Sequence, residues 1–153
     1  MKILISNDDG IFAPGIKALV SAFAKAGYEV YVAAPDSQRS AASHSMTLFR
    51  PLTAKETTFE GAVKAWAIDG TPVDCVKLAV ETLCPEVEAV LSGINHGYNA
   101  GSDVLYSGTV GAAMEGALSG KPALAVSLGY EREDTYDKAA ALAHIEETCR
   151  TYG

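Results

Sequence analysis

The chain opens with a short apolar run followed by a segment of helical periodicity and a second apolar run. Residues 2–6 are almost entirely apolar, which is typical of a strand buried on both faces. From Pro14 to Gly27 apolar side chains recur at helical spacing, and Pro suits a first helical turn because it has no N–H to leave unpaired. Residues 28–34 are rich in Val and Tyr and form the second predicted strand. The pattern predicts a right-handed βαβ unit.

The same alternation continues along the chain. Residues 46–53 and 63–68 are expected to form two short strands, a hairpin or small β excursion beside the main sheet. The other expected elements are helices over residues 71–83, 109–119 and 134–151 and strands over 87–91 and 122–128. No internal repeat or linker divides residues 1–153, so a single domain is expected. Alternating strands and helices predict an α/β fold with a mainly parallel sheet.

Charge narrows the classes of partner. Twelve Lys and Arg against nineteen Asp and Glu give a net charge of −7, whereas nucleic-acid polymers and anionic membranes are bound by basic faces. A small anionic substrate stays possible, because a bound cation reverses the local sign. No apolar stretch reaches the length of a membrane span, and the N-terminus does not resemble a signal peptide. We therefore expect a soluble, cytoplasmic protein that binds no nucleic-acid polymer and no membrane.

The cysteines do not form a recognisable metal motif. Cys75, Cys84 and Cys149 are odd in number and have none of the short paired spacings of a zinc site. All three fall in segments predicted to be helical. We expect buried free thiols in a reducing compartment.

In open α/β sheets ligands bind beyond the carboxyl ends of the strands, so the loops after strands are of most interest. The first such loop begins Asn7-Asp8-Asp9-Gly10. Two adjacent carboxylates repel each other unless a cation lies between them, and hard cations such as Mg²⁺ and Mn²⁺ prefer carboxylate, amide and water oxygens. The alternative is an ordinary turn in which Asn and Asp bond the backbone ahead of the glycine.

Two further loops carry polar groups at strand ends. Residues 35–41 follow the second strand, which is expected to lie beside the first, and a hydroxyl there could reach the same ion; the alternative is a solvated loop. Residues 92–101 contain three glycines that allow close backbone approach, while Asn95 and Asn99 supply amide oxygens and N–H groups. A plain flexible loop is the alternative for this segment.

The fourth segment, residues 106–113, precedes a helix of small residues. Ser107, Gly108 and Thr109 present backbone N–H groups and two hydroxyls at the positive end of that helix, an arrangement that binds anions. An ordinary N-cap by Ser107 or Thr109 would have the same sequence.

Taken together, four motifs occur in order: Asn-Asp-Asp-Gly, Pro-x4-Ser-Ala, Ser-Gly-Ile-Asn-x-Gly-x-Asn and Tyr-Ser-Gly-Thr-Val-x-Ala-Ala-x-Glu-Gly. In these motifs the chain resembles the SurE (survival protein E) family along essentially its whole length. The resemblance implies a Rossmann-like three-layer α/β core and one divalent cation per subunit, Mg²⁺ or Mn²⁺. It also implies a nucleotidase, a phosphatase of the phosphoric monoester hydrolase class that acts on nucleoside 5′- and 3′-monophosphates.

The resemblance also assigns roles to individual residues. The implied metal ligands are Asp8, Asp9, Ser40 and Asn95. The residues implied to hold the phosphate are Ser107, Gly108 and Thr109, with Asn99 nearby. As a hypothesis, Asp8 or Asp9 orients the attacking water, which the cation activates. His44 and His96 are open between protonating the leaving oxygen and a structural or surface role.

Members of the family continue beyond the point where this chain ends, at Gly153. We therefore expect a fragment or a shortened variant that lacks the family's C-terminal portion, and the homodimer or homotetramer that the family implies is in doubt. The alternative to an enzyme is a non-catalytic phosphate- or nucleotide-binding module that has lost turnover. A dinucleotide-binding role is disfavoured, because carboxylates stand where that fingerprint needs a Gly-rich turn.

Overall fold

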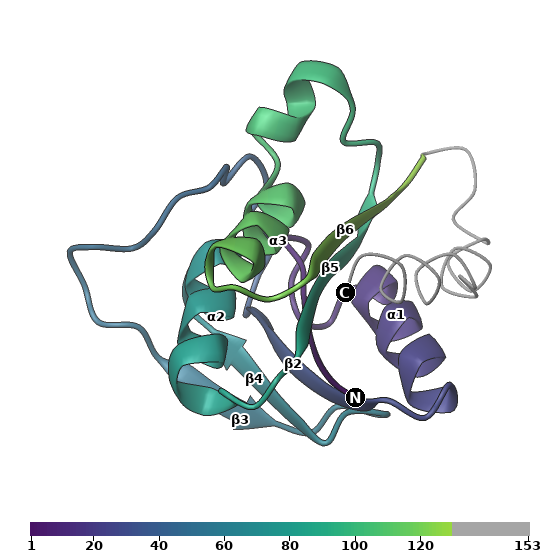
Figure 1. Ribbon diagram of the computed structural model, residues 1–153. Helices are drawn as coiled ribbons and strands as arrows, with labels where there is room; N and C mark the ends of the chain where they lie inside the picture. Colours follow the sequence, from purple (N-terminus) through teal and green to yellow (C-terminus); the bar gives the residue numbers. More distant parts are fainter. Residues whose placement is uncertain (130–153) are drawn as a thin grey trace.

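The computed structural model describes residues 1–129, and within them six strands form one sheet in the order β3-β4-β2-β1-β5-β6 (Figure 1). Every neighbouring pair is parallel except β3 and β4. The strands are β1 (Lys2–Ser6), β2 (Glu29–Pro35), β3 (Ala54–Thr57), β4 (Lys64–Ile68), β5 (Ala89–His96) and β6 (Ala123–Leu128). The helix expected over residues 134–151 lies outside the described residues, as does Cys149.

Helices cover both faces of the sheet. The helical elements are α1 (Pro14–Lys25), α2 (Pro72–Leu78), the π-helical turn η1 (Ala79–Leu83), the 3-10 turn η2 (Gly101–Leu105) and α3 (Gly108–Leu118). Figure 1 shows α1 on one face and α2 and α3 on the other. The predicted Rossmann-like three-layer α/β architecture with a mainly parallel sheet is confirmed.

The alternation of side chains along β1 explains the two cores. Ile3 and Ile5 pack with α1 in one apolar cluster, whereas Leu4 belongs to a second cluster with α2 and α3. All three are fully buried or nearly so. Burying each such side chain contributes about 1.5–3 kcal/mol to the stability of the fold, so β1 helps to stabilise the apolar cluster on both faces of the sheet.

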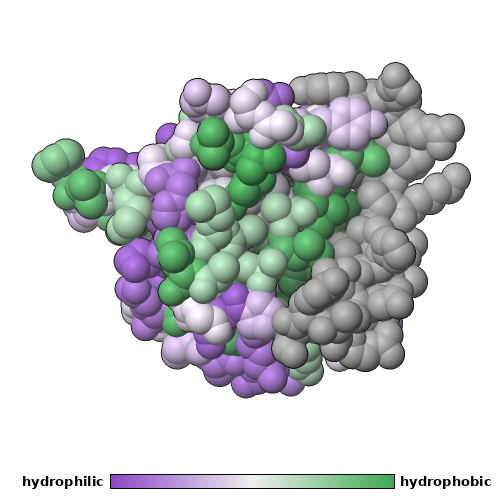
Figure 2. Space-filling model, turned by 45° about the horizontal axis from the view of Figure 1, so that its top comes forward, coloured by the Kyte–Doolittle hydropathy of each residue, from purple (hydrophilic) through white to green (hydrophobic). Residues whose placement is uncertain are grey.

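The predicted excursion at residues 46–68 is partly wrong. Residues 46–53 form no strand; β3 begins only at Ala54. Instead they belong to an arm that projects at the left of Figures 1 and 2 and exposes Leu48 and Phe49, and Figure 2 shows hydrophobic side chains at its tip. The strand predicted over 63–68 is confirmed as β4, but it pairs parallel with β2 and so belongs to the main sheet. Side-chain anchors on Asp69 and Asp74 replace strand pairing along the arm.

Two other boundaries differ from the prediction. The strand expected over residues 87–91 continues to His96, so residues 92–96, the first half of the expected loop 92–101, are strand. This extension pairs with β6 across an irregularity between Ser92 and Asn95. Gly93 lies there with φ +137°, and a Cβ on it would be 2.4 Å from the Val126 carbonyl oxygen. Only glycine fits this conformation without strain.

The sheet fixes where a ligand can bind. β1 lies between β2 and β5. From β1 the chain continues to β2 on one side, and from β5 it continues to β6 on the other side. Their carboxyl ends meet at one edge, which is the position where open α/β sheets bind ligands. Within the described residues no helix has the length and apolarity needed to cross a membrane. Cys75 and Cys84 are free and buried, as predicted.

Candidate active site at the carboxyl ends of the central strands

Three hydrogen bonds join separate loops to the adjacent residues Asp8 and Asp9. The backbone N–H of Arg39 donates to the Asp8 carbonyl at 2.7 Å. The hydroxyl of Thr109 donates to Asp8 Oδ1 at 2.6 Å, and the backbone N–H of His96 donates to Asp9 Oδ2 at 3.2 Å. The segments after β1, β2 and β5 and the start of α3 therefore converge, as the sequence predicted.

Asp8 is the most buried acid of this group. Asp8 is only 7% exposed, and its carboxylate accepts a hydrogen bond from the Thr109 hydroxyl. Burial raises the pKa of Asp8 above its ordinary value and the nearby Asp9 carboxylate raises it further, although the hydroxyl and backbone N–H of Thr109 act in the opposite direction. A divalent cation beside the two carboxylates would offset this increase in pKa, because it favours their charged forms.

Gly108 explains how α3 approaches so closely. A Cβ at this position would be 2.8 Å from Asp8 Cβ and 3.0 Å from Asp8 Oδ2. Such contacts are shorter than carbon atoms tolerate, so glycine is needed for the helix to begin beside the carboxylate. The Ser107 hydroxyl accepts from the Val110 N–H at 3.2 Å, the ordinary N-cap that the sequence left open. The positive end of α3 therefore faces Asp8.

The amide side chains near the aspartates have defined orientations. Asn95 Nδ2 donates to the Gly97 carbonyl at 3.0 Å, and among the described residues its amide oxygen has no protein partner. Asn7 Nδ2 donates to the Gly10 carbonyl at 2.8 Å, which supports the turn interpretation for that residue. Asn7 Oδ1 is buried and has no hydrogen-bond partner in the described part of the chain. Both amides therefore leave an oxygen of the kind that hard cations prefer.

This donor set fits a hard divalent cation. It offers two carboxylates, a hydroxyl and amide oxygens, the ligands that Mg²⁺ and Mn²⁺ prefer. Residues 1–129 contain no group of three or more His, Cys, Asp or Glu side chains arranged to hold a metal ion. Arg39 donates to Asp8 and His96 donates to Asp9. The predicted ligands Ser40 and Asn95 are adjacent in sequence to these two residues and therefore lie in the same region.

Ser40 belongs to a segment, residues 39–47, that we call the strap. Its first residue donates to Asp8, and Ser40 itself is exposed. Ala41 and Ser43 adopt left-handed backbone conformations, with φ of 56° and 53°. For residues with a Cβ each costs on the order of 1 kcal/mol or more, so neighbouring contacts must hold the strap in place.

The strap lies on the outer side of α3. The Ser43 N–H donates to the Tyr106 carbonyl at 3.1 Å, and the Ser43 carbonyl oxygen would be 2.5 Å from a Cβ on Gly111. His44 Nε2 lies 2.9 Å from Glu115 Oε2, further along the helix. This contact favours the structural interpretation of His44 over a role as proton donor to the leaving group.

Asp74 anchors the end of the strap. It accepts from the Thr47 N–H at 2.9 Å, the Thr47 hydroxyl at 2.6 Å and the Thr71 N–H at 2.8 Å. The Thr71 hydroxyl donates to the Ser45 carbonyl at 2.6 Å, and Thr71 and Asp74 form a capping box at the start of α2. The helix expected over residues 71–83 begins at this cap, but the sequence did not indicate its contact with the strap.

One predicted substrate residue is held elsewhere. Asn99 Nδ2 donates to Ser127 Oγ at 2.7 Å, which ties it to β6, and no described contact joins it to Ser107, Gly108 or Thr109. Glu115 and Asp74, by contrast, were not identified from the sequence. The signal available for Glu115 was its place as the Glu of the fourth motif, to which no role was assigned.

Comparison with known proteins supports these observations. The family described as "Survival protein SurE" matches residues 3–152. Proteins named 5'-nucleotidase SurE from Desulforudis audaxviator and Synechococcus elongatus are each 53% identical over 94% of this chain. The SurE protein structure from Aquifex aeolicus covers 100% of this chain and 61% of its own, with a TM-score of 0.84 and 38% identity.

The chain spans about half the length of the curated relatives it matches, 56% and 57% for the two named above. The match nevertheless extends over nearly the whole of this chain, and it includes all four loops that meet at Asp8 and Asp9. The fold, the converging loops and the family match agree, and the chain belongs to the SurE family.

Proposed function

We propose that this chain carries the site of a divalent-metal-dependent phosphomonoesterase that hydrolyses nucleoside 5′- and 3′-monophosphates to nucleoside and phosphate. One observation carries the proposal: Asp8, a buried carboxylate next to Asp9, lies at the N-terminal end of α3. A pair of acids beside a positive helix end suits a site that binds a cation and a phosphate together. The name of the relatives, 5'-nucleotidase, supports the same activity.

In this proposal Asp8, Asp9, Ser40 and Asn95 hold the cation, which is Mg²⁺ or Mn²⁺. When bound, the cation neutralises phosphate charge and lowers the pKa of a water molecule. Thr109 holds Asp8 in one orientation through its hydroxyl. The His96 N–H does the same for Asp9.

The phosphate binds at the start of α3, where the Gly108 N–H and the positive end of the helix dipole favour negative charge. The attacking water, oriented by Asp8 or Asp9, gives one proton to that carboxylate as its oxygen bonds to phosphorus. The ester P–O bond breaks and the departing oxygen takes up that proton, so that the nucleoside leaves as an alcohol and phosphate remains. Phosphoryl transfer spreads charge over the equatorial oxygens, and the Gly108 N–H is aimed at that charge.

The test is release of phosphate from p-nitrophenyl phosphate, a nucleoside 5′-monophosphate and a nucleoside 3′-monophosphate with Mn²⁺ or Mg²⁺. We expect release that a chelator abolishes and that Asp9→Asn reduces at least a hundredfold. Glu56→Gln, an exposed acid on β3, is the matched control and should leave the rate unchanged. Metal-dependent nucleotide binding without release would select the non-catalytic binding module instead. Release that persists after chelation would contradict the metal role.

A further inference from the structure

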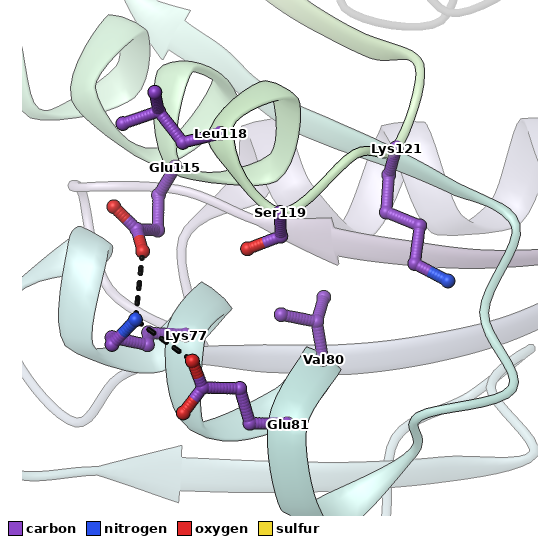
Figure 3. Close-up of a pocket in the computed structure, with 7 residues that line it drawn as sticks. All are labelled: Lys77, Val80, Glu81, Glu115, Leu118, Ser119 and Lys121. Carbon is purple, nitrogen blue, oxygen red and sulfur yellow. Dashed lines mark hydrogen bonds and ion pairs between the residues drawn. The ribbon is translucent and has the colours of Figure 1, made fainter.

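Glu115 is a buried acid on α3, seven residues or about two helical turns after Gly108. The residue is 5% exposed and borders a hollow of about 420 Å³ between α2, η1 and α3 (Figure 3). Lys77 Nζ lies 3.4 Å from Glu115 Oε1 and 2.8 Å from Glu81 Oε1. A buried carboxylate is costly unless it is paired, so Glu115 depends on such partners.

The second partner of Glu115 comes from the strap. His44 Nε2 lies 2.9 Å from Glu115 Oε2, whereas Lys77 binds the other oxygen. Lys77 is also the nearer partner of the exposed Glu81, so its charge is shared between two acids. The short contact with His44 is therefore the tighter of the two contacts that Glu115 makes.

The position of His44 within the strap gives this contact a consequence at the metal site. Ser40 lies between two tethers, the Arg39 N–H on the Asp8 carbonyl and the His44 side chain on Glu115. Ala41 and Ser43 hold left-handed conformations between them. Strained residues keep such conformations only where their surroundings hold them, so a strap released at His44 can relax and move Ser40.

We propose that Glu115, acting through His44, is a positioning residue that holds Ser40 at the metal site. This inference rests on the proposed role of Ser40 as a metal ligand. The other contacts on this side of Ser40 are the Ser43 N–H bond to Tyr106 and the anchors of Ser45 and Thr47 on Thr71 and Asp74. None of them involves the His44 side chain, so replacing that side chain leaves them in place. His44 is thus the side chain through which α3 sets the position of Ser40.

The test is the affinity of the metal-free protein for Mn²⁺, measured by electron paramagnetic resonance without substrate. We expect His44→Ala to weaken Mn²⁺ binding about tenfold and His44→Gln, whose amide N–H can reach Glu115, to stay within about threefold of the unaltered protein. The His44 side chain is 31% exposed, so its truncation leaves both cores intact. Glu81→Gln alters the same charged network at the far side of Lys77 and should leave the affinity unchanged.

A double-mutant cycle distinguishes positioning from general loosening. If His44 acts through Ser40, His44→Ala adds nothing to the loss caused by Ser40→Ala, because the ligand it positions is already absent. Additive losses, or a His44→Ala affinity equal to that of the unaltered protein, would overturn the inference.

Failure of the positioning role can be distinguished from failure of the proposed nucleotidase activity. If Mn²⁺ affinity falls in His44→Ala as expected but the protein releases no phosphate, the proposed nucleotidase activity is wrong and the positioning role of Glu115 and His44 stands. If the protein releases phosphate but His44→Ala leaves Mn²⁺ affinity unchanged, the nucleotidase activity stands and the positioning role is wrong. A protein that binds no Mn²⁺ overturns both.

Discussion

The hydroxyl of Thr109 donates a 2.6 Å hydrogen bond to Asp8 Oδ1, although the two residues are 101 positions apart. Thr109 is in the first turn of α3 and Asp8 follows β1, so the bond joins the helix to the central strand. It also fixes the carboxylate in one orientation at the positive end of the helix. The contact is therefore where the fold and the chemistry of the site meet.

Thr109→Val removes this hydroxyl and keeps the shape of the side chain. Asp8 loses a hydrogen bond inside the protein, and hydrogen bonds to charged groups contribute about 1.5–3 kcal/mol. We expect the metal-free variant to lose that much of its free energy of unfolding and its Mn²⁺ affinity to fall. Urea denaturation and Mn²⁺ titration measure the two effects. Thr109→Ser keeps the donor, so it should lose stability only and bind Mn²⁺ normally; equal affinity in both variants would contradict the role of the hydroxyl.

Gly116→Ala tests how tightly α3 packs on the sheet. A Cβ there would be 2.7 Å from Val90 Cβ, so we expect destabilisation of about 1–3 kcal/mol from overpacking. At an open helical position the same change would stabilise by about 1 kcal/mol. Val90→Ala should relieve the clash, and the double variant should be more stable than the sum of the single effects by about 0.5–3 kcal/mol in chemical denaturation. Strict additivity would show that the two residues do not meet.

Asp74→Ala should release the arm that follows the strap. The change leaves three donors on Thr47 and Thr71 without their acceptor, and we expect a loss of about 2–4 kcal/mol in the free energy of unfolding. Because Phe49 is 99% exposed, chymotrypsin cleavage after it should accelerate when the anchor is removed. Glu60→Ala, at an exposed acid elsewhere on the surface, serves as the control. Unchanged cleavage in Asp74→Ala would refute the anchoring.

The buried thiols predict an alkaline loss of stability. Burial raises the pKa of Cys84 to about 12 from an ordinary value of 9.0, and burial also raises the pKa of Cys75 well above its ordinary value. Above pH 9 the unfolded thiol ionises while the folded one stays neutral, so this contribution is full below about pH 9 and is lost towards pH 12. In a Cys149→Ser background, Cys84→Ala should therefore lessen the fall of the thermal midpoint between about pH 8 and 10.5.

The same burial predicts low reactivity. In the Cys149→Ser background neither Cys75 nor Cys84 should react with a disulfide reagent at about pH 8 until urea unfolds the protein, because the thiolate is the reactive form. Rapid reaction of the folded protein would contradict the burial of these side chains.

Local patterning was sufficient to predict the N-terminal βαβ unit. Strands β1 and β2 and helix α1 follow from apolar periodicity, because each segment buries its own side chains against its neighbours in the chain. The arm at residues 46–53 has strand-like residues, but its fate depends on Asp69 and Asp74, which lie later in the sequence. The extension of β5 to His96 likewise depends on pairing with β6, which no local pattern reveals.

The site was predictable to the extent that its chemistry sits at strand ends. Asp8 and Asp9 stood out because like charges beside a buried strand require an explanation. The partnership of His44 and Glu115 could not be predicted, since the residues are 71 positions apart and each has an ordinary polar interpretation alone. Side-chain contacts between distant segments arise from the packing of α3, which sequence periodicity does not specify.

Helix α3 has glycine at three of its contact surfaces: Gly108 against Asp8, Gly111 against the strap and Gly116 against Val90. At all three surfaces the neighbouring atom leaves no room for a methyl group, and at Gly111 that neighbour is the Ser43 main chain. A gap set by main chain cannot be adjusted by a change of rotamer, unlike one set by long side chains. Thermal motion of side chains on the helix therefore changes the spacing between the aspartate loop and the strap very little. A variant that moves the aspartate loop should also move the strap.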